Sequence, residues 1–276
     1  MENRKVVLVT GASSGFGRAC AQHLAKKGYW VFGTSRYPEI VKSFNTEGWQ
    51  GKLEIIKMDV NRNDSVIKGI ALIMEKSGRL DVVINNAGFS ITGSIEDTNM
   101  IEARSQLETN FFGVHRVCRQ VLPIMREQGS GYIINISSLA GLVGIPFQAF
   151  YSASKFAVEG FTETLRMEVK PFGIRVVLVE PGDFHTPLTL NRQKTKKSQE
   201  KTVYWESFHK ALGAAEESER KGESPEKIAY LIERIIETEK PKLRYKIGPS
   251  STIVGLKKFI PEGTAEWAVM KIFKLT

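Results

Sequence analysis

The chain has 276 residues, of which 42% are hydrophobic and 25% are charged. This composition is ordinary for a globular protein and argues against a disordered or fibrous chain. The length permits one large α/β domain or two small ones. The formal net charge of +9 could attract nucleic acid, anionic lipid or an anionic substrate. No nucleic-acid-binding motif accompanies the charge, so we expect no nucleic-acid partner.

The number of cysteines and the length of the first apolar run indicate the cellular compartment in which the protein is expected. Cys20 and Cys118 are the only cysteines, which is too few for a disulfide framework and fits a reducing environment. The first apolar run, VVLVT at 6–10, has the length of a strand rather than of a secretion signal or a membrane span. We therefore expect a cytoplasmic protein with no membrane span. Peripheral contact with a membrane stays an open alternative.

Strand-like and helix-like stretches alternate along the first two thirds of the chain. The strand-like runs are rich in Val and Ile with little polar alternation, as in strands covered on both faces: 5–10, 29–35, 53–59, 80–86, 131–137 and 174–180. Helical segments lie between them, at about 15–27, 63–77, 99–127 and 149–170. With a last strand at 243–248, this order predicts a Rossmann-type, doubly wound parallel sheet of about seven strands. We expect a single domain over 1–276, because no linker precedes residue 187.

The pattern changes after Pro187. Residues 188–222 are polar and weakly periodic, so we expect a variable loop that covers the substrate, with the basic run 192–197 in solvent. Ser224 is the expected N-cap of a helix over 224–237. The tail, 249–276, predicts one or two amphipathic helices that cover the core or the pocket, in preference to membrane contact.

A glycine-rich turn follows the first strand and opens the first helix. Glycine permits positive φ and a close approach of the backbone to a ligand, and a helix N-terminus favours an anion. The spacing, G-x3-G-x-G, differs from that of the general dinucleotide fingerprint. Its place between a strand and a helix predicts a pyrophosphate site formed by Gly11, Ser13, Ser14, Gly15, Phe16 and Gly17.

The ends of the next two strands bear on the choice of cofactor. A carboxylate after the second strand would bind ribose hydroxyls and repel a 2′-phosphate. Here neutral Ser35 and then Arg36 occupy that place. A guanidinium forms charge-assisted hydrogen bonds to phosphate, so we expect NADP(H) in preference to NAD(H). Asp59, expected to close the third strand, and Val60 are interpreted as the adenine contact, although Asp is also a common turn former.

Tyr151 and Lys155 stand four residues apart in YSASK, within the helix expected over 149–170. This spacing places two side chains next to each other on one helix face. A phenol has an unperturbed pKa of about 10, and a neighbouring ammonium lowers it. We therefore interpret Tyr151 as the group that donates a proton to a carbonyl oxygen or removes one from an alcohol.

The sequence resembles the short-chain dehydrogenase/reductase family over about residues 5–187. Six features occur in the family's order and spacing: TGASSGFG at 10–17, NNAG at 85–88, Asn110, the serine pair 137–138, YSASK and PGDFHT at 181–186. Each motif alone is weak evidence for the family, but all six in this order and spacing are strong evidence. The stretch that begins GIPFQAFYSASKF, at 144, also resembles the 17β-hydroxysteroid and retinol dehydrogenase branch.

The resemblance implies roles for individual residues. Ser138, rather than Ser137, would orient and polarise the substrate carbonyl, and Asn110 would hold a water that links Lys155 to solvent. Lys155 would also bind the nicotinamide ribose. Further cofactor contacts are implied for Asn86, Ala87, Gly88, Tyr151, Pro181, Gly182 and Thr186, the last at the carboxamide.

We therefore expect an NADP(H)-dependent oxidoreductase that interconverts a carbonyl and an alcohol. Aromatic and aliphatic residues near the site suggest a lipophilic substrate such as a steroid or retinoid: Phe147, Phe150, Phe184, Leu188 and Leu190, with His185 as a further candidate contact. The alternatives are a reductase of small polar ketones and a sensor or scaffold that binds NADP(H) without chemistry. No metal is expected, and the family implies a homodimer or homotetramer.

Overall fold

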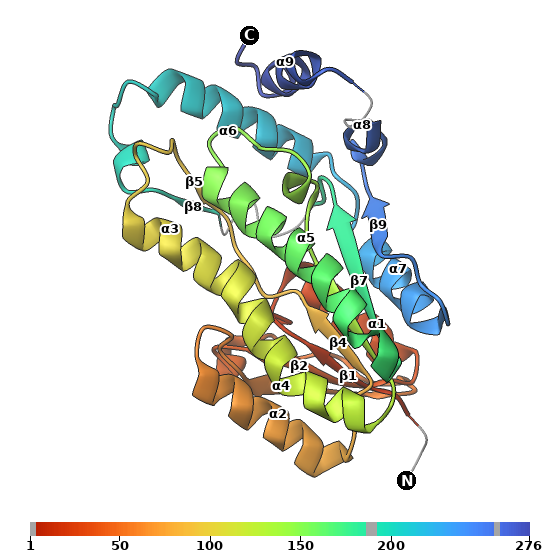
Figure 1. Ribbon diagram of the computed structural model, residues 1–276. Coiled ribbons are helices and arrows are strands. Elements are labelled where there is room, and N and C mark those ends of the chain that lie inside the picture. The colour runs from red at the N-terminus through yellow and green to blue at the C-terminus, as the bar shows by residue number, and fades with distance from the viewer. Residues whose placement is uncertain (1–3, 186–191, 257–259) are drawn as a thin grey trace.

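The computed structural model describes residues 4–185, 192–256 and 260–276. Seven parallel strands form one sheet in the order β3-β2-β1-β4-β6-β7-β9 (Figure 1). Their bounds are β1 Val6–Val9, β2 Trp30–Ser35, β3 Lys52–Lys57, β4 Val82–Asn85, β6 Gly131–Ile136, β7 Ile174–Pro181 and β9 Arg244–Ile247. The predicted Rossmann-type sheet is confirmed. The chain reverses its direction of growth between β1 and β4, where folds of this type bind their ligands at the carboxyl ends of the strands.

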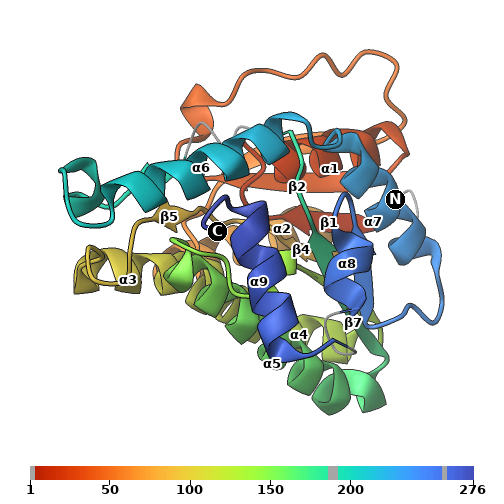
Figure 2. The same cartoon turned by 90° about the horizontal axis from the view of Figure 1, so that it is seen from above.

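Helices cover both faces of the sheet, which explains the unbroken Val and Ile runs of the strands. On one face lie α2 (Asn63–Ser77), α4 (Gly113–Glu127) and α5 (Ala149–Val169), and on the other lie α1 (Gly15–Lys26) and α7 (Glu226–Glu237) (Figure 2). Each face has its own apolar core. Val117 and Leu165 belong to the first core, and Leu24 and Ile232 belong to the second.

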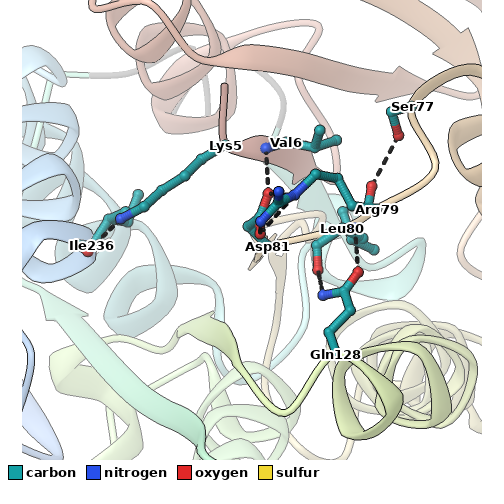
Figure 3. A network of polar contacts seen from close by, with 8 residues as sticks. All are labelled: Lys5, Val6, Ser77, Arg79, Leu80, Asp81, Gln128 and Ile236. Atoms are coloured by element: carbon teal, nitrogen blue, oxygen red, sulfur yellow. Dashed lines mark hydrogen bonds and ion pairs between the residues drawn. The ribbon is translucent and has the colours of Figure 1, made fainter. Parts of the chain in front are cut away.

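The amino ends of the central strands are joined by a polar network that lies away from the ligand edge (Figure 3). The Asp81 carboxylate accepts the backbone N–H of Val6 at 2.7 Å and a guanidinium bond from Arg79 at 2.6 Å. Gln128 forms two hydrogen bonds of 2.9 Å with the backbone of Leu80. This network ties β1, β4 and the end of α4 together, and leaves the carboxyl edge for function.

The helix expected over 99–127 is divided. It consists of α3 (Met100–Leu107), a π-helical turn over Glu108–Phe112 and α4. Asn99 and Glu102 form a capping box at its start. A π-helical turn inserts one extra residue into a helix, and such turns are frequent at functional sites. Here it contains Asn110.

The segment 188–222 was expected to be a loop, and this expectation is wrong for most of its described part. Gln193–Lys194 forms β8, which pairs with β5 (Ile91–Thr92), and Trp205–Arg220 forms the four-turn helix α6. The basic run 192–197 is not simply solvated, because Thr195 is fully buried and the Arg192 side chain is only 3% exposed. α6 packs through Phe208, Ala211 and Leu212, and its small alanines obscured this apolar stripe in the sequence.

The last part of the chain lies over the carboxyl edge of the sheet. Figure 2 looks down on this edge, with α6, α8 (Ser251–Leu256) and α9 (Glu262–Ile272) across it. The tail was expected to form one or two helices, and its described part forms two. Ser224 is not the N-cap of α7, because Pro225 occupies that position and the Ser224 hydroxyl instead hydrogen bonds to Glu226. Within the described ranges, no helix combines the length and apolar character needed to cross a membrane.

Candidate active site

The glycine-rich turn between β1 and α1 has the geometry of an anion cradle. Gly11 and Gly15 adopt φ values of 67° and 54°, which favour glycine. A Cβ placed on Gly17 would lie 2.3 Å from the carbonyl oxygen of Gly11, so the close approach requires glycine there. The N-cap of α1, Ser14, makes no side-chain capping hydrogen bond, and the first turn contains no acidic residue. The helix therefore directs uncapped N–H groups at this turn, as a pyrophosphate requires.

Thr10 and Asn86 hold a second turn against the first. The Thr10 hydroxyl accepts the backbone N–H groups of Asn86, at 2.9 Å, and Ala87, at 3.0 Å. In return, the Asn86 amide donates to the carbonyls of Thr10 and Gly11, at 2.9 and 3.1 Å. The predicted cofactor turn 86–88 is thus bound to the glycine turn. Thr10 was missed in the sequence, where a Thr at the end of a strand gives no separate signal.

The carboxyl ends of β2 and β3 carry the residues expected to select the cofactor. Ser35 is buried, and its hydroxyl accepts the backbone N–H of Tyr37 at 3.1 Å. Arg36 is exposed and has no ion-pair partner within the described ranges. β3 ends at Lys57, so Asp59 does not close the strand but lies in the following turn, where its carboxylate accepts the N–H of Asn61. The turn-forming interpretation of Asp59 therefore holds, and its adenine contact stays a prediction, as does that of Val60.

Tyr151 and Lys155 lie on consecutive turns of α5, as the YSASK spacing predicts. The Lys155 ammonium nitrogen lies 5.8 Å from the centre of the Tyr151 ring and donates a 2.8 Å hydrogen bond to the carbonyl of Ile136, the last residue of β6. This bond anchors the lysine at the carboxyl edge of the sheet. Lys155 is buried, whereas Tyr151 is half-buried and reaches a cavity.

Burial shifts the pKa values of both Lys155 and Tyr151. Desolvation lowers the pKa of Lys155 to about 8, against the opposing charge of Glu159. Desolvation also raises the pKa of Tyr151 above 10, and a hydrogen bond with Ser138 only partly offsets the increase. The expectation that a neighbouring ammonium lowers the phenol pKa is therefore wrong: desolvation is the largest influence and raises the pKa, and the charge that lowers it is that of Arg192. At neutral pH, Tyr151 carries its proton.

Ser138 and Asn110 flank this pair in different ways. Ser138 follows β6 and caps a short 3-10 turn, with its hydroxyl accepting the N–H of Ala140 at 3.1 Å. Asn110 is buried, and its side chain bonds both backbone groups of Phe89, at 3.1 and 3.0 Å, as well as the Ser154 hydroxyl at 3.1 Å. In this structure the Asn110 amide fastens the turn after β4 to α5. Its role in holding a water stays a prediction.

One cavity of about 120 Å³ joins Tyr151 and Ser138 to the substrate side. Its apolar wall includes Ile145, Phe184, Ile272 and Phe273. Its polar wall includes Gln148, Asp183, Arg192, Ser218 and Glu219. α6 and α9 therefore supply side chains to the same cavity as α5, which confirms that the tail covers the pocket.

Several predicted substrate contacts lie elsewhere. Phe147 does not line the cavity and packs against Phe208 of α6, with ring centres 5.6 Å apart. His185 is exposed and likewise does not line the cavity. Pro181 and Gly182 line it, as does Phe184. Thr186, Leu188 and Leu190 lie outside the described residues.

A second group of charges lies behind Lys155. Arg244 of β9 pairs with Glu159, with Glu163 at 2.5 Å and with Glu180 at 2.6 Å. Glu159 follows Lys155 by one turn of α5 and is 6% exposed. Desolvation raises its pKa to about 7, with the neighbouring Glu180 adding to the increase and Ser137 and Arg244 opposing it.

Comparisons with known proteins agree with this geometry. The family model described as short chain dehydrogenase matches residues 5–197. The 3-ketodihydrosphingosine reductase of Bacteroides thetaiotaomicron is 43% identical over 271 residues, which cover 98% of this chain and 97% of that protein. Retinol dehydrogenase 8 of Bos taurus is 32% identical over 275 residues, covering 94% of this chain and 87% of that protein.

Solved structures resemble the chain over nearly its whole length. A short-chain dehydrogenase from Streptomyces avermitilis has 35% sequence identity and a TM-score of 0.80, with 97% of each chain covered. A metagenomic short-chain oxidoreductase in complex with NADP has 25% identity and a TM-score of 0.70, covering 88% of this chain and 96% of that one. A protein from Burkholderia phymatum in complex with NAD shares the fold at 24% identity and a TM-score of 0.77, with 93% of each chain covered.

Proposed function

Because the chain belongs to the short-chain dehydrogenase/reductase family, we propose that it interconverts a carbonyl and an alcohol with NADP(H). The observation that carries this proposal is that Tyr151 and Ser138 line one cavity, at the edge where the glycine turn opens. Lys155 lies one helical turn away, anchored to β6. These are the groups that carbonyl reduction needs: a proton donor, a hydrogen-bond donor to the carbonyl oxygen and a positive charge nearby.

The direction that the site favours is reduction. The Ser138 hydroxyl donates a hydrogen bond to the substrate carbonyl and polarises it, and Tyr151 then gives its phenolic proton to the developing alkoxide. The raised pKa keeps that proton on Tyr151 at neutral pH, as an acid requires. A bound nicotinamide supplies the hydride. Lys155 holds positive charge beside the phenol, at the position where its resemblance to the family places the nicotinamide ribose.

NADP(H) is the proposed cofactor because Ser35 is neutral and Arg36 is exposed beside it. The relatives in complexes hold NADP in one case and NAD in another, so the preference rests on these two residues of the chain. The glycine turn and the uncapped α1 terminus fit the pyrophosphate that both cofactors share.

The proposed substrate is a lipophilic carbonyl compound, a ketone or an aldehyde. Ile145, Phe184, Ile272 and Phe273 give the cavity an apolar wall, and the relative named 3-ketodihydrosphingosine reductase matches the chain from end to end. A retinoid is the second candidate, supported by the match to retinol dehydrogenase 8.

The test is a panel of carbonyls with NADPH and NADH: 3-ketodihydrosphingosine, retinal, a steroid ketone and a small polar ketone. Consumption of NADPH with one of the three lipids supports the proposal. The lipid with the highest kcat/KM identifies the substrate class. Turnover of the small polar ketone alone would contradict the lipophilic assignment. Binding of NADPH without turnover of any carbonyl in the panel would favour the sensor or scaffold.

We also propose a homo-oligomer in the cytoplasm. Phe112, in the π-helical turn, and Phe156, in α5, are exposed in the two helical regions where the family resemblance places subunit contacts. Cys20 and Cys118 are buried free thiols, which fits a reducing compartment. Light scattering coupled to gel filtration measures the assembly, and fractionation of cells that express the chain measures the location.

A further inference from the structure

Arg192 is a buried cation on the wall of the cavity that contains Tyr151. The chain enters β8 directly after it, and the pairing of β8 with β5 fixes its position at the rim of the site. Its side chain is 3% exposed, and its Nη2 pairs with the carboxylate of Glu219 on α6. A buried arginine at a catalytic cavity requires a physical reason, because removing a guanidinium from water is costly unless its donors are used.

The donors of Arg192 are only partly used. Nε and Nη1 are buried and have no hydrogen-bond partner in the part of the chain that the structure describes. A guanidinium has five N–H groups and accepts none, so these two nitrogens can only donate. Most buried donors in proteins are satisfied. We therefore expect an acceptor from outside the chain, namely an oxygen atom of the substrate.

The charge of the cavity wall decides what kind of oxygen fits. Glu219 already balances Arg192, and Asp183 adds another carboxylate, which accepts a 2.6 Å hydrogen bond from Ser218. A phosphate or carboxylate on the substrate would lie near these two negative groups and be repelled. A neutral oxygen, such as a hydroxyl, accepts from Arg192 without this penalty.

The size of the cavity decides where the oxygen lies on the substrate. The volume of about 120 Å³ is small beside the several hundred Å³ of a usual ligand pocket. Tyr151 and Arg192 both line this small space, so the oxygen that Arg192 binds is separated by few bonds from the carbonyl that Tyr151 protonates.

We propose that Arg192, held by Glu219, is a specificity-determining residue that binds a neutral oxygen substituent next to the reacting carbonyl, so that the preferred substrates are hydroxyketones. The inference rests on the proposed function for its reaction, whereas the binding of such ketones can be measured without turnover. The apolar wall of Ile145, Ile272 and Phe273 receives the rest of the substrate.

The experiment compares a long-chain hydroxymethyl ketone, the methyl ketone of the same chain length and the matching keto acid. Their dissociation constants are measured by calorimetry with the wild-type protein, R192M and R192K, and kcat/KM is measured with NADPH. Wild type should bind the hydroxymethyl ketone about 10- to 100-fold more tightly than the methyl ketone, as a hydrogen bond to a charged group implies. R192M should remove this preference and change binding of the methyl ketone less than about threefold. R192K, which keeps the charge but loses the planar fork, should retain only part of the preference.

The exposed Arg220, next to Glu219 on α6, supplies the matched control. R220M removes the same charge outside the cavity and should leave all three dissociation constants unchanged. An equal loss for both neutral ketones in R192M would overturn the inference, because it would indicate a structural role. A wild-type preference for the keto acid would overturn the assignment to a neutral oxygen. A weaker affinity for NADPH in R192M, with the ketone preference intact, would assign Arg192 to the cofactor instead. If wild type prefers the hydroxymethyl ketone in binding but turns over none of the three, the proposed reaction fails while this inference stands.

Discussion

Two arginines differ in what they bind: Arg244 pairs with α5 one turn beyond Lys155, and Arg192 lines the cavity that contains Tyr151. Arg244, behind Lys155, pairs with three carboxylates, whereas Arg192, on the cavity wall, pairs with Glu219. The atoms left without partners differ in kind. Behind Lys155 they are acceptor oxygens of Glu159 and Glu180, and at the cavity they are donor nitrogens of Arg192.

This difference indicates a structural role for Arg244 and a ligand-binding role for Arg192. An excess of buried carboxylate can be relieved by taking up a proton, which is what the raised pKa of Glu159, about 7, describes. A guanidinium has no such relief, because it does not lose its proton in proteins. The unused donors of Arg192 therefore need an acceptor on a ligand. The carboxylates around Arg244 need none, because a proton can neutralise the excess charge, and their ion pairs with Arg244 join α5, β7 and β9.

The largest effect is expected at Tyr151, which shares its cavity with Arg192. Y151F removes the only proton that the phenol can give, so kcat should fall by about 10²- to 10⁴-fold. Binding of NADPH, measured by fluorescence titration, should change little, because the ring remains. Turnover equal to that of wild type would show that another group is the acid. The cavity shared by Tyr151 and Arg192 would then not be the site of proton transfer.

The next largest effect is a loss of stability in R244M, which distinguishes the roles of the two arginines. R244M leaves three carboxylates without their cation, so the free energy of unfolding should fall by about 2–4 kcal/mol, as for other broken buried pairs. Denaturant unfolding of R244M and R192M measures this loss. The preference of R244M among ketone substrates should equal that of wild type. A changed preference in R244M, or none in R192M, would reverse the roles assigned here.

A third arginine extends the comparison to the cofactor. Arg36 is exposed beside Ser35, so it should bind its phosphate only when the cofactor arrives. S35D places a carboxylate beside that phosphate and should raise the KM for NADPH by about 10- to 30-fold through charge repulsion. The KM for NADH should not increase, and S35N, which adds bulk without charge, is the control. Equal effects of S35D on both cofactors would mean that Arg36 does not face the 2′-phosphate.

The smallest effect is a pH dependence of stability. The folded pKa of Glu159, about 7, exceeds the ordinary 4.5, so the native state binds more protons than the unfolded state between these values. The contribution of Glu159 to stability should therefore fall as the pH rises from about 4.5 to 7 and should stay constant above that range. E159Q should flatten this pH dependence, because the glutamine side chain has no carboxyl group to titrate, and denaturation midpoints at several pH values measure the change. An unchanged slope would show that Glu159 does not titrate there.

Prediction from the sequence worked for several local signals, although it failed for others, such as the N-cap expected at Ser224. The glycines of the first turn, the four-residue spacing of Tyr151 and Lys155 and the Val and Ile runs each encode their own geometry within a few residues. Glu159 continues the same α5 stripe and could have been recognised by extending the spacing one more turn. Thr10 could not, because its importance lies in hydrogen bonds to Asn86 and Ala87, far along the chain.

By itself, the sequence determined the parallel α/β fold, the glycine-rich turn after the first strand and the family, because repeated local patterns specify which elements form and how successive strands connect. Only the tertiary structure decided the substrate side of the site. There, Arg192 meets Glu219 across 27 residues, and Ile272 and Phe273 reach the cavity of Tyr151 from the end of the chain. It also decided the direction of the Tyr151 pKa, because the desolvation that raises it depends on everything packed around the phenol.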